Sequence, residues 1–297
     1  MLLQRLPLSK VFTERPAPLT FILPGLLAGT TGLLIGPGGV SKSMLAMQTA
    51  LSLSMGRDLW HLWGDGGATL PQGRVVLLNL EDPPAILEHR LHDIGEALRP
   101  DEHAAVDENL DVMPLYGTGF SIAQKDPRSG LIVASPYMLE VLEFCRGAML
   151  VVIDTFNRSL SGLDENSNTD VGAVLAIVEA MCRQTGCAVL ILHHMSKGGA
   201  LNTPDAQQSS RGASALTDNA RFQLNLTTMS KDEAKARRVD DEERRRWVQM
   251  DLSKVNYAPP QAPRWFYRGR GGVLEGQQQP PAVQKSSSSR RRADDDE

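Results

Sequence analysis

The chain has 297 residues, a formal net charge of −4, and 41% hydrophobic residues. This length is enough for one large α/β domain with a buried core, and the acidic balance excludes a protein coated with basic residues, as non-specific DNA packagers are. The three cysteines, at positions 145, 182 and 187, are too few and too irregularly spaced for a disulfide framework or a zinc knuckle.

Residues 1–20 contain proline and show no regular pattern, so we expect an N-terminal arm that lies across the domain or a neighbouring subunit. They lack a continuous apolar segment and a cleavage-like site, and no secretory signal is predicted. No apolar run approaches the roughly 18 residues of a membrane span. We therefore expect a cytoplasmic protein with no membrane partner.

A glycine-rich segment follows the first apolar strand and leads into an apolar helix. In the pattern G-x-x-x-x-G-K-[ST], backbone N–H groups surround the phosphates of a nucleotide, the lysine reaches the outer phosphates, and the hydroxyl binds Mg²⁺. This predicts an ATP site with Lys42 on the phosphates and Ser43 on the metal. The predicted nucleotide contacts are Gly36, Pro37, Gly38, Gly39, Val40, Ser41, Lys42, Ser43 and Met44.

Ser41 departs from this pattern, because it stands where the second glycine belongs. The backbone conformation expected there costs a residue with a Cβ about 1 kcal/mol. Gly38 and Gly39 can supply the freedom that the loop needs; otherwise the loop holds nucleotide loosely. The alternative is a glycine-rich turn without a ligand.

The rest of the chain alternates apolar runs with helical stretches, which is typical of a parallel sheet covered by helices. The core strands are predicted at 33–35, 75–80, 149–153 and 188–192, and the helices at 44–55, 84–98, 137–145 and 171–185. Later strands are predicted at 221–227, 247–252 and 265–267, with a charged, helix-prone insert at 230–246. We therefore predict an α/β domain over 21–275 and, from composition, a disordered tail over 276–297.

Two of the predicted strands end in carboxylates. Asp154 follows the apolar run 149–153 and is typical of a Walker B aspartate that holds Mg²⁺; the alternative is a buried strand whose last aspartate caps a turn. Glu81 and Asp82 follow the strand 75–80, where Pro83 and Pro84 stop the strand and start a helix. Ligands of open α/β sheets lie at this edge. We favour Glu81 as the catalytic base and Asp82 as the helix N-cap.

The strand 188–192 ends in His193 and His194, of which one is expected to contact the γ-phosphate. The alternatives are one core and one exposed histidine, or a zinc site. Polar segments at 157–170 and 197–214 are long enough to be functional loops or disordered segments. Lys197 and Arg211 are candidate contacts to the DNA backbone, and simple solvated loops are the alternative.

Taken together, these motifs resemble the RepA-type hexameric replicative helicases of broad-host-range plasmids, a family of RecA-like P-loop ATPases. The resemblance runs from Leu19 to Leu274. It rests on the ordered blocks LPGLLAGTTGLLIGPGG, KSMLAMQ, LEDPP, HRLH, VVIDTFNR, ILHHMSKGG, SSRGASALTDNARFQL, SKVNYAPP and RWFYR.

The resemblance implies a RecA-like core that binds ATP and Mg²⁺, a homo-hexameric ring, and translocation on single-stranded DNA during plasmid replication with other replication proteins. It implies that Lys42 is the phosphate-loop lysine and Asp154 the Walker B aspartate. Glu81 is then the catalytic glutamate, His194 the γ-phosphate histidine, and Arg221 the arginine finger that reaches a neighbouring subunit.

The resemblance also implies that Arg90 faces DNA and that Lys254 lies close to the subunit boundary. Ser41 departs from the family's usual glycine. Two other functions stay open: a RecA-like switch that binds ATP to assemble with a partner and turns over little, and a RecA-like recombination or repair ATPase that forms filaments.

Overall fold

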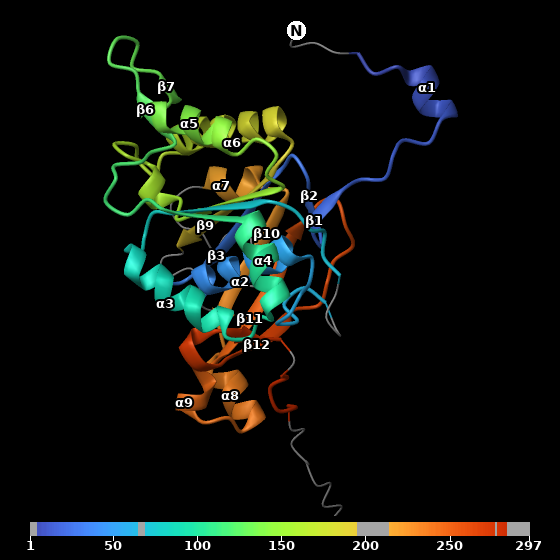
Figure 1. The fold of residues 1–297 in the computed structure, drawn as a ribbon, viewed down its shortest axis with the longest axis vertical. Helices are drawn as coiled ribbons and strands as arrows, with labels where there is room; N and C mark the ends of the chain where they lie inside the picture. Colours follow the sequence, from blue (N-terminus) through green and yellow to red (C-terminus); the bar gives the residue numbers. More distant parts are fainter. Residues whose placement is uncertain (1–4, 65–68, 195–213, 277, 284–297) are drawn as a thin grey trace, which may run out of the picture.

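The computed structural model describes residues 5–64, 69–194, 214–276 and 278–283 (Figure 1). Within these residues the main sheet has nine strands in the order β13-β12-β11-β10-β3-β9-β8-β4-β5. The six strands from β10 to β5 are parallel: β3 (Thr31–Gly36), β4 (Val75–Asn79), β5 (Leu110–Pro114), β8 (Leu150–Asp154), β9 (Ala188–His194) and β10 (Phe222–Thr228). The others continue the sheet antiparallel: β11 (Trp247–Val255), β12 (Arg264–Arg268) and β13 (Leu274–Glu275).

The parallel strands are buried on both faces, which is why they read as continuous apolar runs. Every residue of β4 and of β8 is buried. Successive side chains of a strand point to opposite faces, so Leu33 and Ile35 enter one core while Leu34 enters the other.

Helices cover both faces of this sheet (Figure 1). One core includes residues of α2 (Lys42–Met55), α3 (Pro84–Gly95) and α4 (Pro100–Asn109). The other includes residues of α5 (Pro136–Phe144), α6 (Asn168–Thr185) and α7 (Ser214–Asn219).

Local sequence explains where several of these helices begin and end. The hydroxyls of Ser135 and Ser167 accept backbone N–H groups at the starts of α5 and α6, as N-cap side chains do. Helices α2 and α6 end at Gly56 and Gly186, which take the left-handed backbone that glycine adopts without penalty.

The remaining elements are short. They are α1 (Leu8–Thr13), β1 (Phe21–Leu23), β2 (Leu26–Leu27), β6 (Ala123–Lys125), β7 (Ile132–Ala134), η1 (Asn157–Ser159), α8 (Lys231–Arg237), α9 (Asp241–Arg244) and η3 (Arg270–Gly272). Helix α1 has no buried residue and projects from the body of the molecule (Figure 1). The division into arm, domain and tail stays a prediction, and residues 277 and 284–297 of the tail lie outside the described residues.

The fold confirms the predicted α/β class, with a mostly parallel sheet and later antiparallel strands. The predicted helix at 84–98 was too long, since α3 ends at Gly95. Helix α4, strand β5 and the two small hairpins were not predicted. No helix in the described part of the chain combines the length and apolarity needed to cross a bilayer.

Candidate active site

The predicted phosphate loop connects the end of β3 to the start of α2, at the carboxyl edge of the parallel strands. Gly36 has to be glycine, because a Cβ there would lie 2.7 Å from the carbonyl oxygen of Leu226 and 2.8 Å from Cγ1 of Val40. Val40 is buried in the core, which fixes the base of the loop. The loop is therefore held closely from below by the sheet.

Ser41 takes the strained backbone expected at its position. Its φ of 77° and ψ of 26° are left-handed, and it is the N-cap residue of α2. Gly39 also has a positive φ, of 76°. The turn of the loop thus contains Gly39, which adopts a positive φ without penalty, and Ser41, which adopts it at a cost in free energy.

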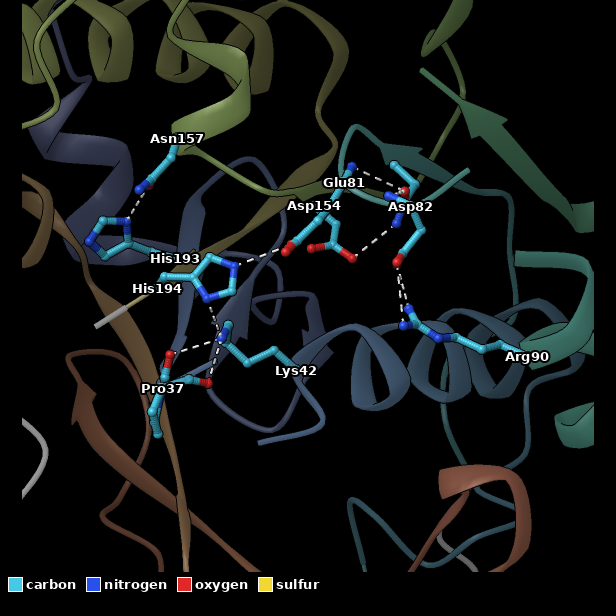
Figure 2. A network of polar contacts seen from close by, with 11 residues as sticks. Pro37, Lys42, Glu81, Asp82, Arg90, Asp154, Asn157, His193 and His194 are labelled. Carbon is cyan, nitrogen blue, oxygen red and sulfur yellow. Dashed lines mark hydrogen bonds and ion pairs between the residues drawn. The ribbon is translucent and has the colours of Figure 1, made fainter. Parts of the chain in front are cut away.

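The ammonium group of Lys42 contacts three acceptors (Figure 2). Its Nζ lies 2.8 Å from the carbonyl oxygen of Gly36, 3.0 Å from that of Pro37 and 3.1 Å from Nδ1 of His194. Burial lowers the pKa of Lys42 to about 8, although the nearby carboxylates of Asp154 and Glu81 oppose the shift. Lys42 is therefore mostly charged at neutral pH.

His194 connects Lys42 to Glu81. An ammonium group can only donate, so Nδ1 of His194 accepts from Lys42 and its Nε2 donates to Oε2 of Glu81, 3.2 Å away. This hydrogen bond from His194 is the main reason that the pKa of Glu81 lies below its ordinary value, while partial burial opposes the shift. Glu81 is therefore an ionised carboxylate at neutral pH.

Asp154 is almost completely buried at the end of β8, next to Asn79 at the end of β4. Nδ2 of Asn79 donates to Oδ2 of Asp154 across 3.1 Å. Burial raises the pKa of Asp154 to about 6; the Ser43 hydroxyl lowers it in part, whereas the nearby carboxylates add to the rise.

The donor set fits Mg²⁺. Oδ1 of Asp154 is buried without a hydrogen-bond partner among the described residues, and the Ser43 hydroxyl lies beside this carboxylate. In the described part of the chain no three His, Cys, Asp or Glu side chains gather as a protein-only metal site would need. Mg²⁺ bound together with substrate phosphates needs only one or two protein carboxylates.

Asp82 does not cap α3, contrary to the expectation from sequence. The N-cap residue is Pro83, whose fixed φ suits the start of a helix. The carboxylate of Asp82 instead pairs with the guanidinium of Arg90, in the second turn of α3 (Figure 2). Arg90 therefore lies in the wall of the candidate site, and its contact to DNA stays a prediction.

The side chain of His193 is buried and points away from Lys42 and Glu81. Its Nδ1 lies 3.0 Å from Oδ1 of Asn157, in the segment that follows β8 (Figure 2). Burial lowers the pKa of His193 to about 4, with further contributions from His194 and Lys42. The structure thus brings His194, and not His193, next to Lys42 and Glu81.

A cavity of about 310 Å³ lies beside the phosphate loop, and Lys42, Glu81 and His194 are among the residues that line it. Its lining comprises Gly39, Ser41, Lys42, Ser43, Met44, Glu81, Asp82, Arg90, His194, Arg268, Gly271 and Gly272. The sequence did not predict Arg268, Gly271 or Gly272 at this site. The only signal in the sequence was the arginine at the end of the block RWFYR, which is also what an ordinary strand end looks like.

Arg221 lies at the other edge of the sheet. Phe222 pairs with Gly32, so Arg221 stands level with Thr31 and about 17 Å along the strand from Gly36. Its side chain is exposed. It is therefore remote from the phosphate loop of its own chain.

The remaining predicted residues are Lys254, expected close to a subunit boundary, and Lys197 and Arg211, expected to contact DNA. Lys254 donates to the carbonyl oxygens of Thr217 and Asp218 in α7, 3.1 and 3.0 Å away. Lys197 and Arg211 lie outside the described residues.

Comparisons with known proteins agree with this arrangement. A family model described as AAA domain matches residues 2–200. The chain is similar in structure to a solved ATPase domain, with a TM-score of 0.57, 13% identity, and coverage of 91% of this chain and 96% of that chain. This likeness shows a common fold, that of RecA-like ATPase domains. A weaker match, "Crystal structure of the RadB recombinase", has a TM-score of 0.48, 16% identity, and coverage of 86% and 93%.

Proposed function

Because this chain belongs to the AAA domain family and has the fold of a RecA-like P-loop ATPase, we propose that it is an ATP-dependent DNA helicase. Six copies form a ring that translocates on single-stranded DNA and unwinds DNA during plasmid replication, together with other replication proteins in the cytoplasm.

The observation that carries the ATPase part of this proposal is the contact chain from Lys42 through His194 to Glu81, beside the buried carboxylate of Asp154. These contacts connect a phosphate-binding cation, Lys42, to an ionised general base, Glu81, through the single histidine His194. These are the groups that cleavage of a phosphate anhydride requires.

Each residue has a role that follows from its position. Lys42 binds the outer phosphates, and Ser43 and Asp154 hold Mg²⁺. Glu81 accepts a proton from the attacking water, because its carboxylate is ionised and half-exposed to the cavity. His194 holds Glu81 in place through Nε2–H and connects it to the phosphate-binding Lys42 through Nδ1, which accepts from the Lys42 ammonium group. Bound Mg²⁺ supplies positive charge that stabilises the transferred phosphoryl group.

Arg221 acts on a neighbouring copy. A guanidinium at the transferred phosphoryl group is worth about 10³–10⁵ in rate, but Arg221 is one strand length away from its own phosphate loop. An assembly that brings the amino edge of one copy, with its Arg221, to the phosphate loop of the next copy would complete the site. Such a head-to-tail contact forms a ring when it closes.

The DNA part of the proposal rests on the ordered set of motifs that resemble those of the RepA-type helicases. The acidic net charge requires a local DNA contact; in a ring, six sets of loops converge, so that few cations per copy suffice. The proposed DNA contacts are Arg90, Lys197 and Arg211. Arg90 would have to leave Asp82 to reach DNA.

The test is ATP hydrolysis by size-fractionated protein with and without single-stranded DNA, together with strand separation on a forked substrate. We expect stimulation in a hexamer fraction and unwinding that depends on ATP. Hydrolysis that ignores DNA, with no unwinding, would contradict the helicase.

The strained backbone of Ser41 favours one other candidate, a switch that binds ATP, assembles with a partner and hydrolyses slowly. The same assay separates the two functions, because a switch shows assembly without rapid turnover. An open series of masses, in place of one closed hexamer, would indicate a filament-forming recombination or repair ATPase.

A further inference from the structure

Three cations face the cavity, and they differ in how their charge is balanced. Lys42 contacts two loop carbonyls and His194, and Arg90 pairs with Asp82. Arg268 pairs with no carboxylate among the described residues. Within the described residues, Arg268 is thus the cation of the cavity wall that has neither a carboxylate nor a histidine partner.

Arg268 is held at the cavity by the antiparallel part of the sheet. It ends β12, where its backbone pairs with Leu274 of β13. Its side chain reaches back over the phosphate loop and donates from Nη2 to the carbonyl oxygen of Gly39 across 3.2 Å. Residues 229 positions apart in the chain therefore meet at the loop that is predicted to bind phosphate.

The remaining donors of Arg268 are incompletely used. Its Nε is buried and has no hydrogen-bond partner in the described residues. Partial burial disfavours its positive charge and lowers its pKa, yet a guanidinium stays charged in proteins. A partly buried charge without a counter-charge carries part of the cost of desolvation, and an anion in the cavity would offset that cost.

We propose that Arg268 binds the phosphate chain of the nucleotide held by its own subunit. A planar guanidinium with free donors matches phosphate oxygens better than any other side chain. The proposal rests on the ATPase function proposed above and adds a cation in cis to the arginine expected in trans. Its contact to Gly39 positions the guanidinium at the loop.

Calorimetric titration of the full chain with Mg²⁺–ATP and with inorganic tripolyphosphate tests this role. Replacing Arg268 by Ala should weaken both ligands about ten- to a hundredfold, since a hydrogen bond between charged groups is lost. Arg268→Lys, which keeps the charge, should restore part of the affinity. Arg268→Gln, which keeps a polar side chain but has no charge, should restore little.

Arg270→Ala is the matched control. Arg270 lies two residues after Arg268 and carries the same charge, but its side chain is exposed and pairs with Glu96. It should leave both affinities unchanged. Thermal unfolding without ligand checks that every variant is folded.

Three outcomes would overturn the inference. Full rescue by Gln would mean that the charge of Arg268 plays no part in binding. Weakened ATP binding with unchanged tripolyphosphate binding would mean that it contacts the nucleoside. Unchanged binding of both would mean no ligand contact. If the unaltered protein binds neither ligand, the proposed ATPase function fails as well.

Discussion

The two edges of the parallel sheet carry very different chemistry. At the carboxyl edge, Lys42, Glu81 and His194 line one cavity beside the buried carboxylate of Asp154. Burial, hydrogen bonds and neighbouring charges shift the pKa values of Lys42, Glu81 and Asp154 there. At the amino edge, Arg221 is exposed and no such network surrounds it in the described part of the chain. One copy therefore contains the groups that we propose bind phosphate and activate water, while its candidate finger lies at the opposite edge of the sheet. A substitution at the carboxyl edge should impair the site of the copy that carries it. A substitution of Arg221 at the amino edge should impair the site of the neighbouring copy.

The largest effect is expected for Lys42→Ala. Removing the cation that faces the phosphates should weaken ATP binding beyond detection by calorimetry and abolish hydrolysis. Mixing with unaltered protein should not restore binding to the altered copies. Retained ATP binding by a folded variant would remove Lys42 from its assigned role.

Arg221→Ala tests the amino edge. We expect ATP binding to change little and hydrolysis to fall about 10³-fold, because an arginine finger acts in the transition state. Mixed with Glu81→Gln protein, this variant should regain part of its activity, since each copy supplies what its neighbour lacks. If mixtures stay inactive at all ratios, the two-edge picture is wrong.

Glu81→Gln should keep ATP binding and lower hydrolysis about 10²-fold, because an amide cannot take the proton from water. The amide oxygen can still accept from Nε2 of His194, so the contact chain survives. Glu88→Gln, at an exposed position of α3, serves as control and should be unchanged. Equal loss of binding and hydrolysis in the Glu81 variant would argue for a structural role.

A smaller effect is expected from pH. The pKa of Lys42 is lowered to about 8 by burial, so the free protein loses this proton as pH rises through 8, whereas bound phosphate retains it. ATP affinity should therefore be constant from pH 6 to 7 and fall about tenfold by pH 9. Lys42→Arg, whose charge does not titrate, should abolish this decline in calorimetric titrations, whatever its absolute affinity.

The smallest change is expected for Ser41→Gly. Glycine removes about 1 kcal/mol of left-handed strain, but it adds entropy to the unfolded chain, so the free energy of unfolding should rise by less than about 1 kcal/mol. Steady-state hydrolysis should stay within about threefold of the parent. Gly38→Ala, where an added Cβ meets nothing within 4 Å, is the control. A large gain in turnover by the Ser41 variant would favour the switch.

Sequence alone predicted the carboxyl edge well, for a physical reason. Each parallel strand is buried on both faces and stands out as an apolar run, so the residue after it can be assigned to the common edge. This brought Lys42, Glu81, Asp154 and the pair His193–His194 together before any coordinates, and the family resemblance then selected His194. It failed for α4, which buries only Glu102, and for β5, a half-buried edge strand.

Arg268 could not be predicted in the same way. It comes from an antiparallel strand that is far from the loop in sequence, and the register and crossing of that strand decide where its last side chain lies. Asp82 was misassigned because a carboxylate before a helix usually caps it, whereas here the nearby guanidinium of Arg90 competes for it.

The phosphate loop is attached at both ends to parts of the fold that cannot shift. Strand β3 is hydrogen-bonded along both sides, to β9 and β10, and all its residues after Thr31 are buried. Twelve of the fourteen residues of α2 are buried as well. The backbone that the fold holds least is thus that of residues 37–39, because Val40 is itself buried in the core.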